Sequence, residues 1–327
     1  MKNLKKFMGL FLILCLTLCT FAQVSFAKSF TDVASTASYA EAVNVLSELG
    51  IISGYEDGTF GPDKTIKRSE AAKIIVAMVN KLATAEGRMG ATQFTDVPAD
   101  HWASGFINVG VTEKFINGMG GDIFKPDGEV TYNQIVKMIV SCLGYNEYAT
   151  FYGGYPAGYL SIADSKGITK GCSMNGDAAA TRAIVAQLVY NALPVPLMEQ
   201  TEFGTQTTYT IMDGYGETPY KSPFTELGFA KIEGSIVGTS EKEYNGSKCG
   251  TDEVVYRFDD AYGNEFWEDY LSKNADKDNY ACYTFKFEDG VPVSKYSDAP
   301  SEIYVKKLSD DSYTIIDIRP AEEEEKE

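Results

Sequence analysis

Apolar residues follow two different periodicities along the chain, and the pattern changes close to residue 198. Before that point they recur every three to four residues in short runs, which is typical of amphipathic helices. One run, from Ala42 to Leu49, ends at Gly50, a residue that readily adopts the left-handed conformation found after helices. Beyond Pro194-Val195-Pro196, apolar and polar residues alternate, which predicts β-strands. The sequence therefore predicts a helical part followed by a β-rich part.

The helical part contains an internal repeat with an offset of 64 residues. Phe30-Thr31-Asp32-Val33 recurs as Phe94-Thr95-Asp96-Val97, and Phe60, Pro62 and Asp63 recur as Phe124, Pro126 and Asp127. A third, shorter copy keeps Gly167-Ile168-x-x-Gly171 and Thr181-Arg182-Ala183 but lacks the Phe-x-Asp-Val opening. Such self-similarity is not a coincidence over this length. We place the three copies at residues 28–90, 91–150 and 151–198.

Each copy has the pattern of a helix, a turn-rich loop and a second helix. In the second copy, Thr131-x-x-Gln134 is a capping box, so the second helix is expected to begin at Thr131. One pair of helices cannot bury its apolar faces alone, whereas three pairs can close around a shared centre. We therefore expect the three copies to form one unit.

Arg68 and Arg182 fall in the first turn of a predicted helix, where the helix dipole disfavours a cation by about 0.3–1 kcal/mol. A bound anion would compensate, because the free backbone N–H groups of that turn and the guanidinium would converge on it. The alternative is that each arginine pairs with a nearby aspartate, Asp63 or Asp177. The second copy has Tyr132 at this position, so we expect unequal grooves and a weak or inactive groove at Tyr132.

These motifs resemble the repeat of the S-layer homology family. The matching segments are Phe30 to Val33, Gly50 to Gly54, Asp57 to Pro62 and Lys67-Arg68-Ser69-Glu70 in the first copy, and Phe94 to Val97, His101-Trp102-Ala103 and Thr131 to Gln134 in the second. The resemblance covers residues 28–198. It implies a pseudo-threefold all-α domain with three prongs, whose grooves bind an anionic secondary cell-wall polysaccharide, often one with pyruvate ketals. Other surface-layer proteins are a second candidate partner.

The candidate ligand-binding residues follow from the motifs and from this resemblance: Arg68, Arg182, Trp102, Lys67, Asp32, Asp96 and Tyr155. Trp102 offers an apolar face to a sugar ring, or else packs as a partly buried residue. For Asp32 and Asp96 we favour capping of the following helix over bonding to ligand hydroxyls. His101, the only histidine, is expected at the surface beside Trp102.

The amino terminus has the pattern of a secretory signal peptide at residues 1–27. Lys2, Lys5 and Lys6 precede an apolar run from residue 7 to residue 22, and Ser25-Phe26-Ala27 offers small residues for cleavage. The alternative, a transmembrane anchor, needs about 18 unbroken apolar residues. We therefore expect a secreted protein of the cell wall and cell surface, without a transmembrane anchor after cleavage.

The formal net charge of −17 argues against electrostatic binding of nucleic acid. The charge is uneven, because residues 28–199 hold 13 basic and 18 acidic residues whereas residues 200–327 hold 13 and 28. Residues 321–327 form an acidic tail of the kind that is usually solvated.

Four cysteines remain after the signal peptide: Cys142, Cys172, Cys249 and Cys282. Export permits disulfides, and the simplest pairing joins Cys142 to Cys172 and Cys249 to Cys282. Free buried thiols are an equal alternative.

The β-rich part, residues 199–320, predicts a small all-β barrel or sandwich with hairpin turns at Glu288-Asp289-Gly290 and Ser309-Asp310-Asp311. It resembles no family. It lacks histidine, which excludes Ser-His and Cys-His catalysis and most zinc sites. Asn274-x-Asp276-x-Asp278 begins like a calcium loop but lacks its glycine and closing glutamate.

No cofactor is expected. The favoured function is non-covalent anchoring to the cell wall, with the β-rich part displayed at the surface. The alternative is a wall-tethered carbohydrate-active enzyme whose active site lies in the β-rich part.

Overall fold

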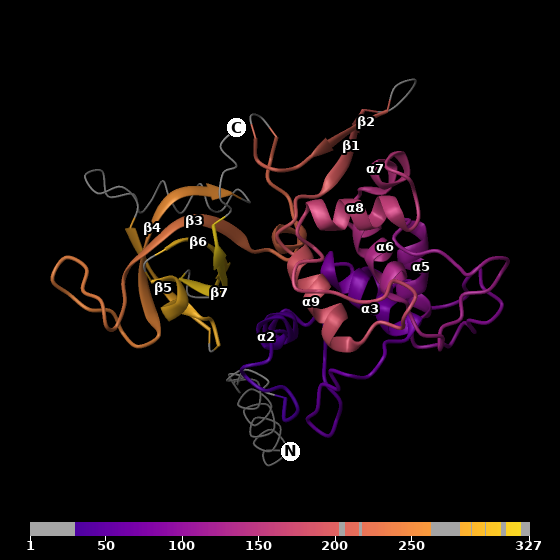
Figure 1. The fold of residues 1–327 in the computed structure, drawn as a ribbon, viewed down its shortest axis with the longest axis horizontal. Coiled ribbons are helices and arrows are strands. Elements are labelled where there is room, and N and C mark those ends of the chain that lie inside the picture. Colours follow the sequence, from indigo (N-terminus) through magenta and orange to yellow (C-terminus); the bar gives the residue numbers. More distant parts are fainter. Residues whose placement is uncertain are drawn as a thin grey trace, which may run out of the picture.

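The computed structural model describes residues 30–202, 207–215, 218–262, 282–288, 290–297, 299–308 and 312–321. The expected signal peptide, the calcium-like loop and nearly all of the acidic tail lie outside these residues. The described part consists of a helical unit and a β unit side by side (Figure 1), as the sequence predicted for an α plus β chain. None of its helices is long and apolar enough to cross a membrane.

Three pairs of helices build the helical unit. The pairs are α2 (Ala40–Glu48) with α3 (Arg68–Met78), α5 (Ser104–Thr112) with α6 (Tyr132–Cys142), and α8 (Ala157–Ser165) with α9 (Arg182–Ala192). Two short helices, α4 (Leu82–Glu86) and α7 (Asn146–Phe151), connect one pair to the next. The second helix of each pair packs on the first helix of another pair: α3 on α5, α6 on α8 and α9 on α2. The packing is therefore cyclic.

A closed ring of backbone hydrogen bonds lies where the three pairs meet. Ile66 N donates to Ala180 O at 3.1 Å, Ala180 N to Val130 O at 2.8 Å, and Val130 N to Ile66 O at 3.1 Å. Each residue comes from a different pair, two residues before its second helix begins, and each is fully buried. These donors and acceptors have no access to water, so each pair needs the other two to satisfy its own backbone.

The second helix of each pair begins with a local cap. Thr131 Oγ1 accepts from Gln134 N at 3.3 Å and Gln134 Oε1 accepts from Thr131 N at 3.2 Å, which confirms the predicted capping box. In the first pair Glu70 accepts from Lys67 N at 2.8 Å, and in the third Thr181 accepts from Ile184 N at 3.4 Å. These caps fix the position of the residue that follows, which is Arg68, Tyr132 or Arg182.

The β unit is a ring of five strands: β3 (Ala230–Gly238), β4 (Glu253–Tyr262), β5 (Cys282–Phe287), β6 (Pro300–Lys307) and β7 (Tyr313–Pro320). They pair in the order β3-β4-β5-β7-β6, and β6 pairs with β3, so the barrel is closed. Only β5 and β7 are parallel among these pairs. Every second residue of β3 is buried, as expected for a strand with one face in the core. The 3-10 helix η1 (Val293–Tyr296) lies between β5 and β6.

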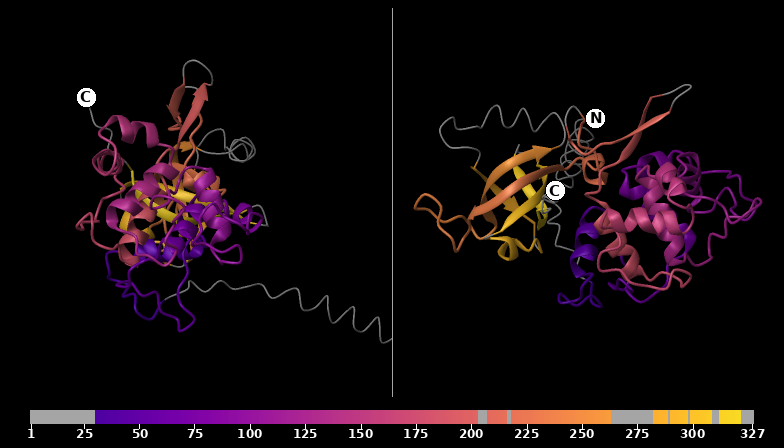
Figure 2. Two further views of the ribbon diagram at one scale, coloured as in Figure 1. Left: turned by 90° about the vertical axis from the view of Figure 1, so that its right-hand side faces the viewer. Right: turned by 45° about the horizontal axis from the view of Figure 1, so that its top comes forward.

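Residues 193–229 connect the two units. They contain a two-stranded antiparallel arm, β1 (Met198–Glu202) with β2 (Thr208–Ile211), and the short helix α10 (Pro223–Glu226). The arm projects away from both units (Figures 1 and 2). Its base is fixed by Met198 N, which donates to Leu143 O at 2.8 Å.

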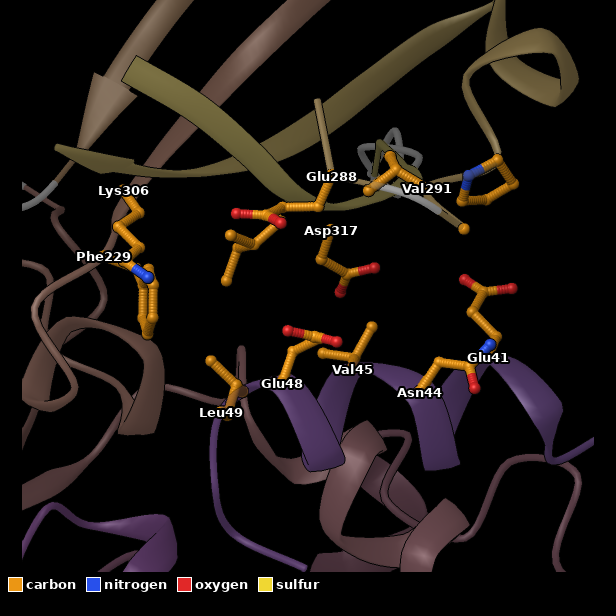
Figure 3. Close-up of a pocket in the computed structure, with 13 residues that line it drawn as sticks. Glu41, Asn44, Val45, Glu48, Leu49, Phe229, Glu288, Val291, Lys306 and Asp317 are labelled. Carbon is orange, nitrogen blue, oxygen red and sulfur yellow. The ribbon is translucent and has the colours of Figure 1, made fainter. Parts of the chain in front are cut away.

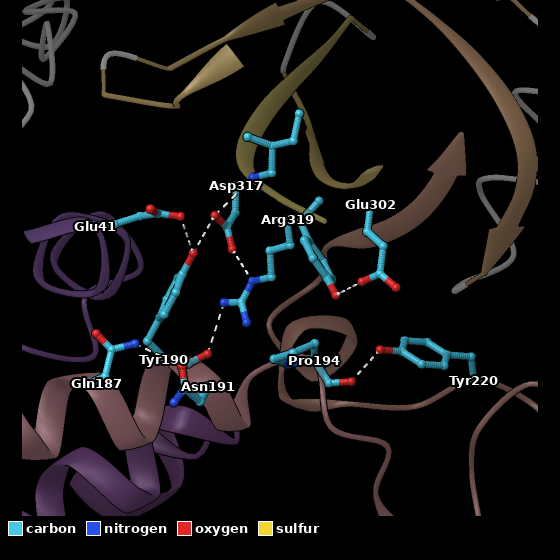
Figure 4. A network of polar contacts seen from close by, with 11 residues as sticks. Glu41, Gln187, Tyr190, Asn191, Pro194, Tyr220, Glu302, Asp317 and Arg319 are labelled. Atoms are coloured by element: carbon cyan, nitrogen blue, oxygen red, sulfur yellow. Dashed lines mark hydrogen bonds and ion pairs between the residues drawn. The ribbon is translucent and has the colours of Figure 1, made fainter. Parts of the chain in front are cut away.

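A polar cluster joins the carboxyl end of α9 to the barrel (Figure 4). Arg319 of β7 donates from Nε to Asp317 at 2.7 Å and from Nη2 to Tyr190 O at 2.9 Å, and its guanidinium lies 3.8 Å from the centre of the Tyr190 ring. The Tyr190 hydroxyl lies 2.8 Å from Glu41 and 3.0 Å from Asp317. Burial raises the pKa of Asp317, and the Arg319 guanidinium opposes that rise.

The four cysteines are free thiols, so the simplest disulfide pairing is wrong. Cys142 lies on α6 against α3, 3.6 Å from Ile75 O, and burial raises its pKa well above the usual range. Burial also raises the pKa of Cys172 to about 11. The Cys282 sulfur accepts from the Tyr244 hydroxyl at 3.2 Å.

The cluster at Arg319 gives a test of how the units are joined. Arg319→Met is expected to lower the free energy of unfolding by about 3–5 kcal/mol, because it leaves the buried Asp317 without its cation. The double variant Asp317→Leu/Arg319→Met should recover most of that loss. Chemical denaturation of the three proteins measures both effects. Equal stability of the single and double variants would show that the ion pair does not carry the interface.

Candidate functional site

A groove of about 240 Å³ lies beside Arg68 and is lined by residues from all three helical pairs. Arg68 comes from the first pair, the loop 115–119 with Gln134 and Lys137 from the second, and Tyr155 from the start of the third. Its lining contains two cations and no acidic residue. In a chain with a net charge of −17, this composition favours a negatively charged ligand.

Arg68 is fixed by the loop of the second pair. Its Nε donates to Phe124 O at 2.7 Å, its Nη2 donates to Asn117 O at 2.8 Å, and its guanidinium lies 4.6 Å from the centre of the Phe124 ring. The side chain is only 5% exposed, and burial lowers its pKa against the opposing effect of Asp96. Among the described residues Nη1 has no partner, so part of this fixed cation stays available to the groove.

Arg182 makes the same contacts with the loop of the first pair. Its Nε donates to Phe60 O and its Nη2 to Ser53 O, both at 2.8 Å. Neither arginine forms an ion pair within the described part of the chain. The alternative that Arg68 and Arg182 pair with Asp63 or Asp177 is therefore wrong, because both arginines bind carbonyl oxygens instead.

The sequence argument expected free backbone N–H groups in the first turn of the helices at Arg68 and Arg182, but these groups already have partners. Arg68 N donates to Gly128 O at 2.9 Å, and Arg182 N donates to Lys64 O at 2.8 Å. Ser69 N and Ala183 N, the next donors, also bind carbonyls of a neighbouring pair. These N–H groups are therefore not free to bind an anion, and the guanidinium and nearby side chains are the remaining donors.

Lys137 is the second cation of the groove, and the sequence analysis missed it. Its Nζ lies 5.5 Å from the centre of the Tyr155 ring and 5.6 Å from that of Tyr159. With the Asn117 amide oriented to satisfy both of its ends, the Asn117 oxygen accepts from Lys137 at 3.0 Å. Burial lowers the pKa of Lys137. One feature of the sequence could have indicated Lys137: the first copy of the repeat has a lysine, Lys73, at the equivalent position 64 residues earlier.

The three equivalent positions around the helical unit differ in charge. The position of Lys137 holds Lys73 in the first pair and Gln187 in the third. Tyr132 replaces arginine in the second pair, and its hydroxyl donates to Cys172 O at 3.3 Å. It thus bridges to the next loop as the arginines do, but without a charge. The groove at Tyr132 therefore lacks both of the cations found at Arg68.

Asp32 and Asp96 hold the loops that the arginines bind. Asp32 accepts from Phe60 N at 2.7 Å and Gly61 N at 2.8 Å, and Asp96 accepts from Phe124 N at 2.8 Å and Lys125 N at 2.7 Å. Burial opposes the change, but these N–H groups lower the pKa of both carboxyls. Each aspartate thereby positions Phe60 or Phe124, whose carbonyl receives an arginine, instead of capping a helix as the sequence favoured.

The remaining candidates lie at different distances from this groove. Tyr155 lines it and is 49% exposed. Lys67 forms an exposed ion pair with Asp127 at 2.8 Å. Trp102 is 48% exposed and stacks on His101 with the ring centres 5.9 Å apart, outside the Arg68 groove.

A second, smaller pocket between α2 and the barrel has the opposite charge. Its volume is about 50 Å³, and Glu41, Glu48, Glu288 and Asp317 are among the residues that line it (Figure 3). An anionic sugar would be repelled there and would not fit. No group of three or more His, Cys, Asp or Glu side chains in the described ranges is arranged to hold a metal ion.

Comparison with known proteins supports the sequence resemblance. The S-layer homology domain model matches residues 29–72 and 93–135. Two segments of the chain are therefore similar to the S-layer homology domain. The third helical pair lies outside both matches.

Three relatives illustrate the extent of the similarity. The surface layer protein of Brevibacillus choshinensis is 35% identical over 219 residues, which are 66% of this chain and 19% of that protein. The middle cell wall protein of Brevibacillus brevis is 36% identical over 175 residues, 54% of this chain and 16% of the relative. The cell surface protein of Thermoanaerobacter kivui is 28% identical over 328 residues, 93% of this chain and 42% of the relative. The chain thus spans less than half the length of each, and the matches support the expected location at the cell surface.

The contacts of Arg68 with two loop carbonyls predict that it has a structural role. Arg68→Met is expected to lower the free energy of unfolding by roughly 2–4 kcal/mol, because two charge-assisted hydrogen bonds to loop carbonyls are lost. Lys137→Met should change it by less than about 1 kcal/mol, since it removes a partly desolvated charge. Thermal or chemical denaturation distinguishes the two, and equal effects would contradict the assignment.

Proposed function

We propose that this chain anchors an exported protein to the bacterial cell wall by binding an anionic secondary cell-wall polysaccharide in the groove at Arg68. The observation that carries this proposal is the pairing of a fixed guanidinium and a lysine, with no acidic neighbour, in one groove. Tyr155 adds an aromatic face at the same groove, against which a sugar ring can pack.

A carboxylate on the sugar fits this chemistry best, and a pyruvate ketal is one such group. The arginine offers Nη1 from a position that the Phe124 and Asn117 carbonyls have already fixed, so little side-chain entropy is lost on binding. Lys137 adds a second positive charge from α6, whereas Arg68 lies on α3. Arg182 has the same carbonyl contacts and Lys73 occupies the equivalent position, so we assign a second, related site there.

We also propose that the third helical pair is a divergent third repeat. Its support is the cyclic packing and the contacts of Arg182, which repeat those of Arg68 with another loop. In this proposal the barrel is displayed from the anchored unit. The relatives reported above carry the names of surface-layer, cell-wall and cell-surface proteins, which favours this role for the barrel over that of an enzyme.

Binding to purified sacculi tests the anchor. Replacing Arg68 and Arg182 together should abolish co-sedimentation, but these residues also hold loops. Lys137→Met is therefore the sharper variant, and it is expected to bind about tenfold more weakly, the effect of losing roughly 1.4 kcal/mol from one charged contact.

Two controls accompany this measurement. Lys248→Met removes an exposed charge on the barrel and should bind like the parent protein. Sacculi stripped of their polysaccharide by hydrofluoric acid should retain none of the proteins. Undiminished binding of the Lys137 variant, or equal binding to stripped sacculi, would exclude the proposed groove.

A further inference from the structure

A tyrosine hydroxyl lies between two carboxyl groups where the helical unit meets the barrel (Figure 4). The Tyr190 hydroxyl of α9 is 2.8 Å from Oε1 of Glu41 and 3.0 Å from Oδ1 of Asp317. Glu41 belongs to α2 of the helical unit, whereas Asp317 belongs to β7 of the barrel. Tyr190 also lines a cleft of about 940 Å³ between the two units. We call Glu41, Tyr190 and Asp317 the tyrosine bridge.

One hydroxyl cannot donate a full hydrogen bond to two carboxylates. A phenol carries a single O–H hydrogen and can otherwise only accept, and an ionised carboxylate can only accept. When both carboxyls are ionised, one of them therefore faces the Tyr190 oxygen without a hydrogen atom between them. If one carboxyl takes up a proton, it donates to the hydroxyl oxygen while the hydroxyl donates to the other carboxylate. The two short contacts of the bridge are thus both hydrogen bonds only when the carboxyls hold one proton.

The burial of the bridge favours the uptake of this proton. Asp317 is 1% exposed, and burial raises its pKa although the Arg319 guanidinium opposes the rise. Burial also raises the pKa of Tyr190 well above its ordinary value, so its hydroxyl keeps its hydrogen at physiological pH. Two carboxyls that interact through one hydroxyl titrate as a pair, so we assign the proton to the bridge and not to one residue.

The charged groups that surround the bridge come from both units. Figure 3 shows carboxyl groups of α2 and of the barrel that face the space between them. The carboxyls are Glu41, Glu48, Glu288 and Asp317, the cations are Lys295 of η1, Lys306 of β6 and Arg319 of β7, and the phenols are Tyr190 and Tyr304. Among these described groups the four carboxyls outnumber the three cations by one. The surroundings therefore also favour one bound proton, because nearby negative charge disfavours the ionised form of a carboxyl.

We propose that the tyrosine bridge is a proton-binding site that holds the barrel against the helical unit when its two carboxyls share a proton, and holds it less tightly when that proton is lost. A carboxyl whose pKa is raised on folding stabilises the folded state at low pH. This contribution is complete below the unfolded carboxyl pKa of about 4, and it is lost as the pH rises through the raised pKa of Asp317. Acid therefore tightens the joint, and alkali loosens it.

The site makes the attachment of the barrel depend on the local pH. An anionic polymer concentrates cations, and hence protons, near its surface. On a chain anchored to an anionic polysaccharide, as proposed above, the joint is therefore tighter at the wall than in free solution. Only this consequence rests on the proposed function, because the bridge is tested on the isolated chain.

Hydrogen exchange of the purified chain between about pH 5 and about pH 8 tests the proposal. After correction for the intrinsic exchange rate, the protection of amides in α2 and β7 is expected to fall as the pH rises. The expected fall is about tenfold for each pH unit over which the pair holds its extra proton. Glu41→Gln replaces the protonated carboxyl by an amide that can donate to the hydroxyl oxygen at every pH. This variant should lose most of the pH dependence.

Glu48→Gln is the matched control, because it removes the same charge from α2 about two turns away from Glu41. It should keep most of the pH dependence of the parent. His101 and the other carboxyls titrate in all three proteins, so their effects cancel in the comparison. Carbon-13 NMR of the carboxyl groups gives a direct readout. One carboxyl of the parent should release its proton above the ordinary range, and this late titration should be absent from Glu41→Gln.

Three outcomes would overturn the proposal. The first is an equal pH dependence of protection in the parent and in Glu41→Gln. The second is a loss of that dependence in Glu48→Gln as complete as in Glu41→Gln, because general repulsion between α2 and the barrel would then be responsible. The third is titration of both bridge carboxyls of the parent in the ordinary range. No polysaccharide takes part in these measurements, so they leave the anchor at Arg68 to its own test.

Discussion

The structure of the helical unit depends on how the start of each second helix is bound by a neighbouring pair. A ring of backbone hydrogen bonds through Ile66, Val130 and Ala180 joins the three pairs. Two residues further along each chain segment, the side chain of Arg68, Tyr132 or Arg182 binds a carbonyl in a loop of another pair. The ring residues, the contacts of the two arginine Nε atoms and the contact of the Tyr132 hydroxyl are buried, where an unpaired donor or acceptor costs about 1–3 kcal/mol. One pair of helices alone would leave several such groups unsatisfied, so the three pairs are stable only together.

This constraint explains why the candidate ligand site lies where it does. A guanidinium has five N–H donors in one plane, and two carbonyls use only some of them. The contacts of Arg68 with these carbonyls therefore leave a fixed cation at the boundary between two pairs, where a groove also forms. Tyr132 performs the structural part of this task with its hydroxyl but has no donor left over. The same contact can thus serve folding with or without a charged side chain, which makes grooves of unequal charge compatible with one fold.

The sequence predicted the local features and missed the long-range ones. The capping box at Thr131, the repeat and the change from helices to strands are all encoded within a few residues, and the structure contains each of them. The acceptors of Arg68 lie 49 and 56 residues away, in another pair. Asp32 and Asp96 looked like helix caps because aspartate often has that role, yet their acceptor oxygens bind a loop 28 residues further on. Periodicity shows which face of a helix is buried but not which loop will cover its end.

The attachment of the barrel could not be predicted from the sequence either. It depends on contacts at the carboxyl end of a helix. The last carbonyls of a helix lack partners within it and carry partial negative charge, which favours a cation. Arg319 lies at this end of α9 and donates to Tyr190 O, which also accepts from Leu193 N, from a strand 129 residues away. Arg182, at the amino end of the same helix, binds the loop of the first pair. Helix α9 is therefore held at one end by the helical unit and at the other by the barrel. Because α9 also lines the cleft between them, the orientation of the barrel and the shape of the cleft are set by the same helix.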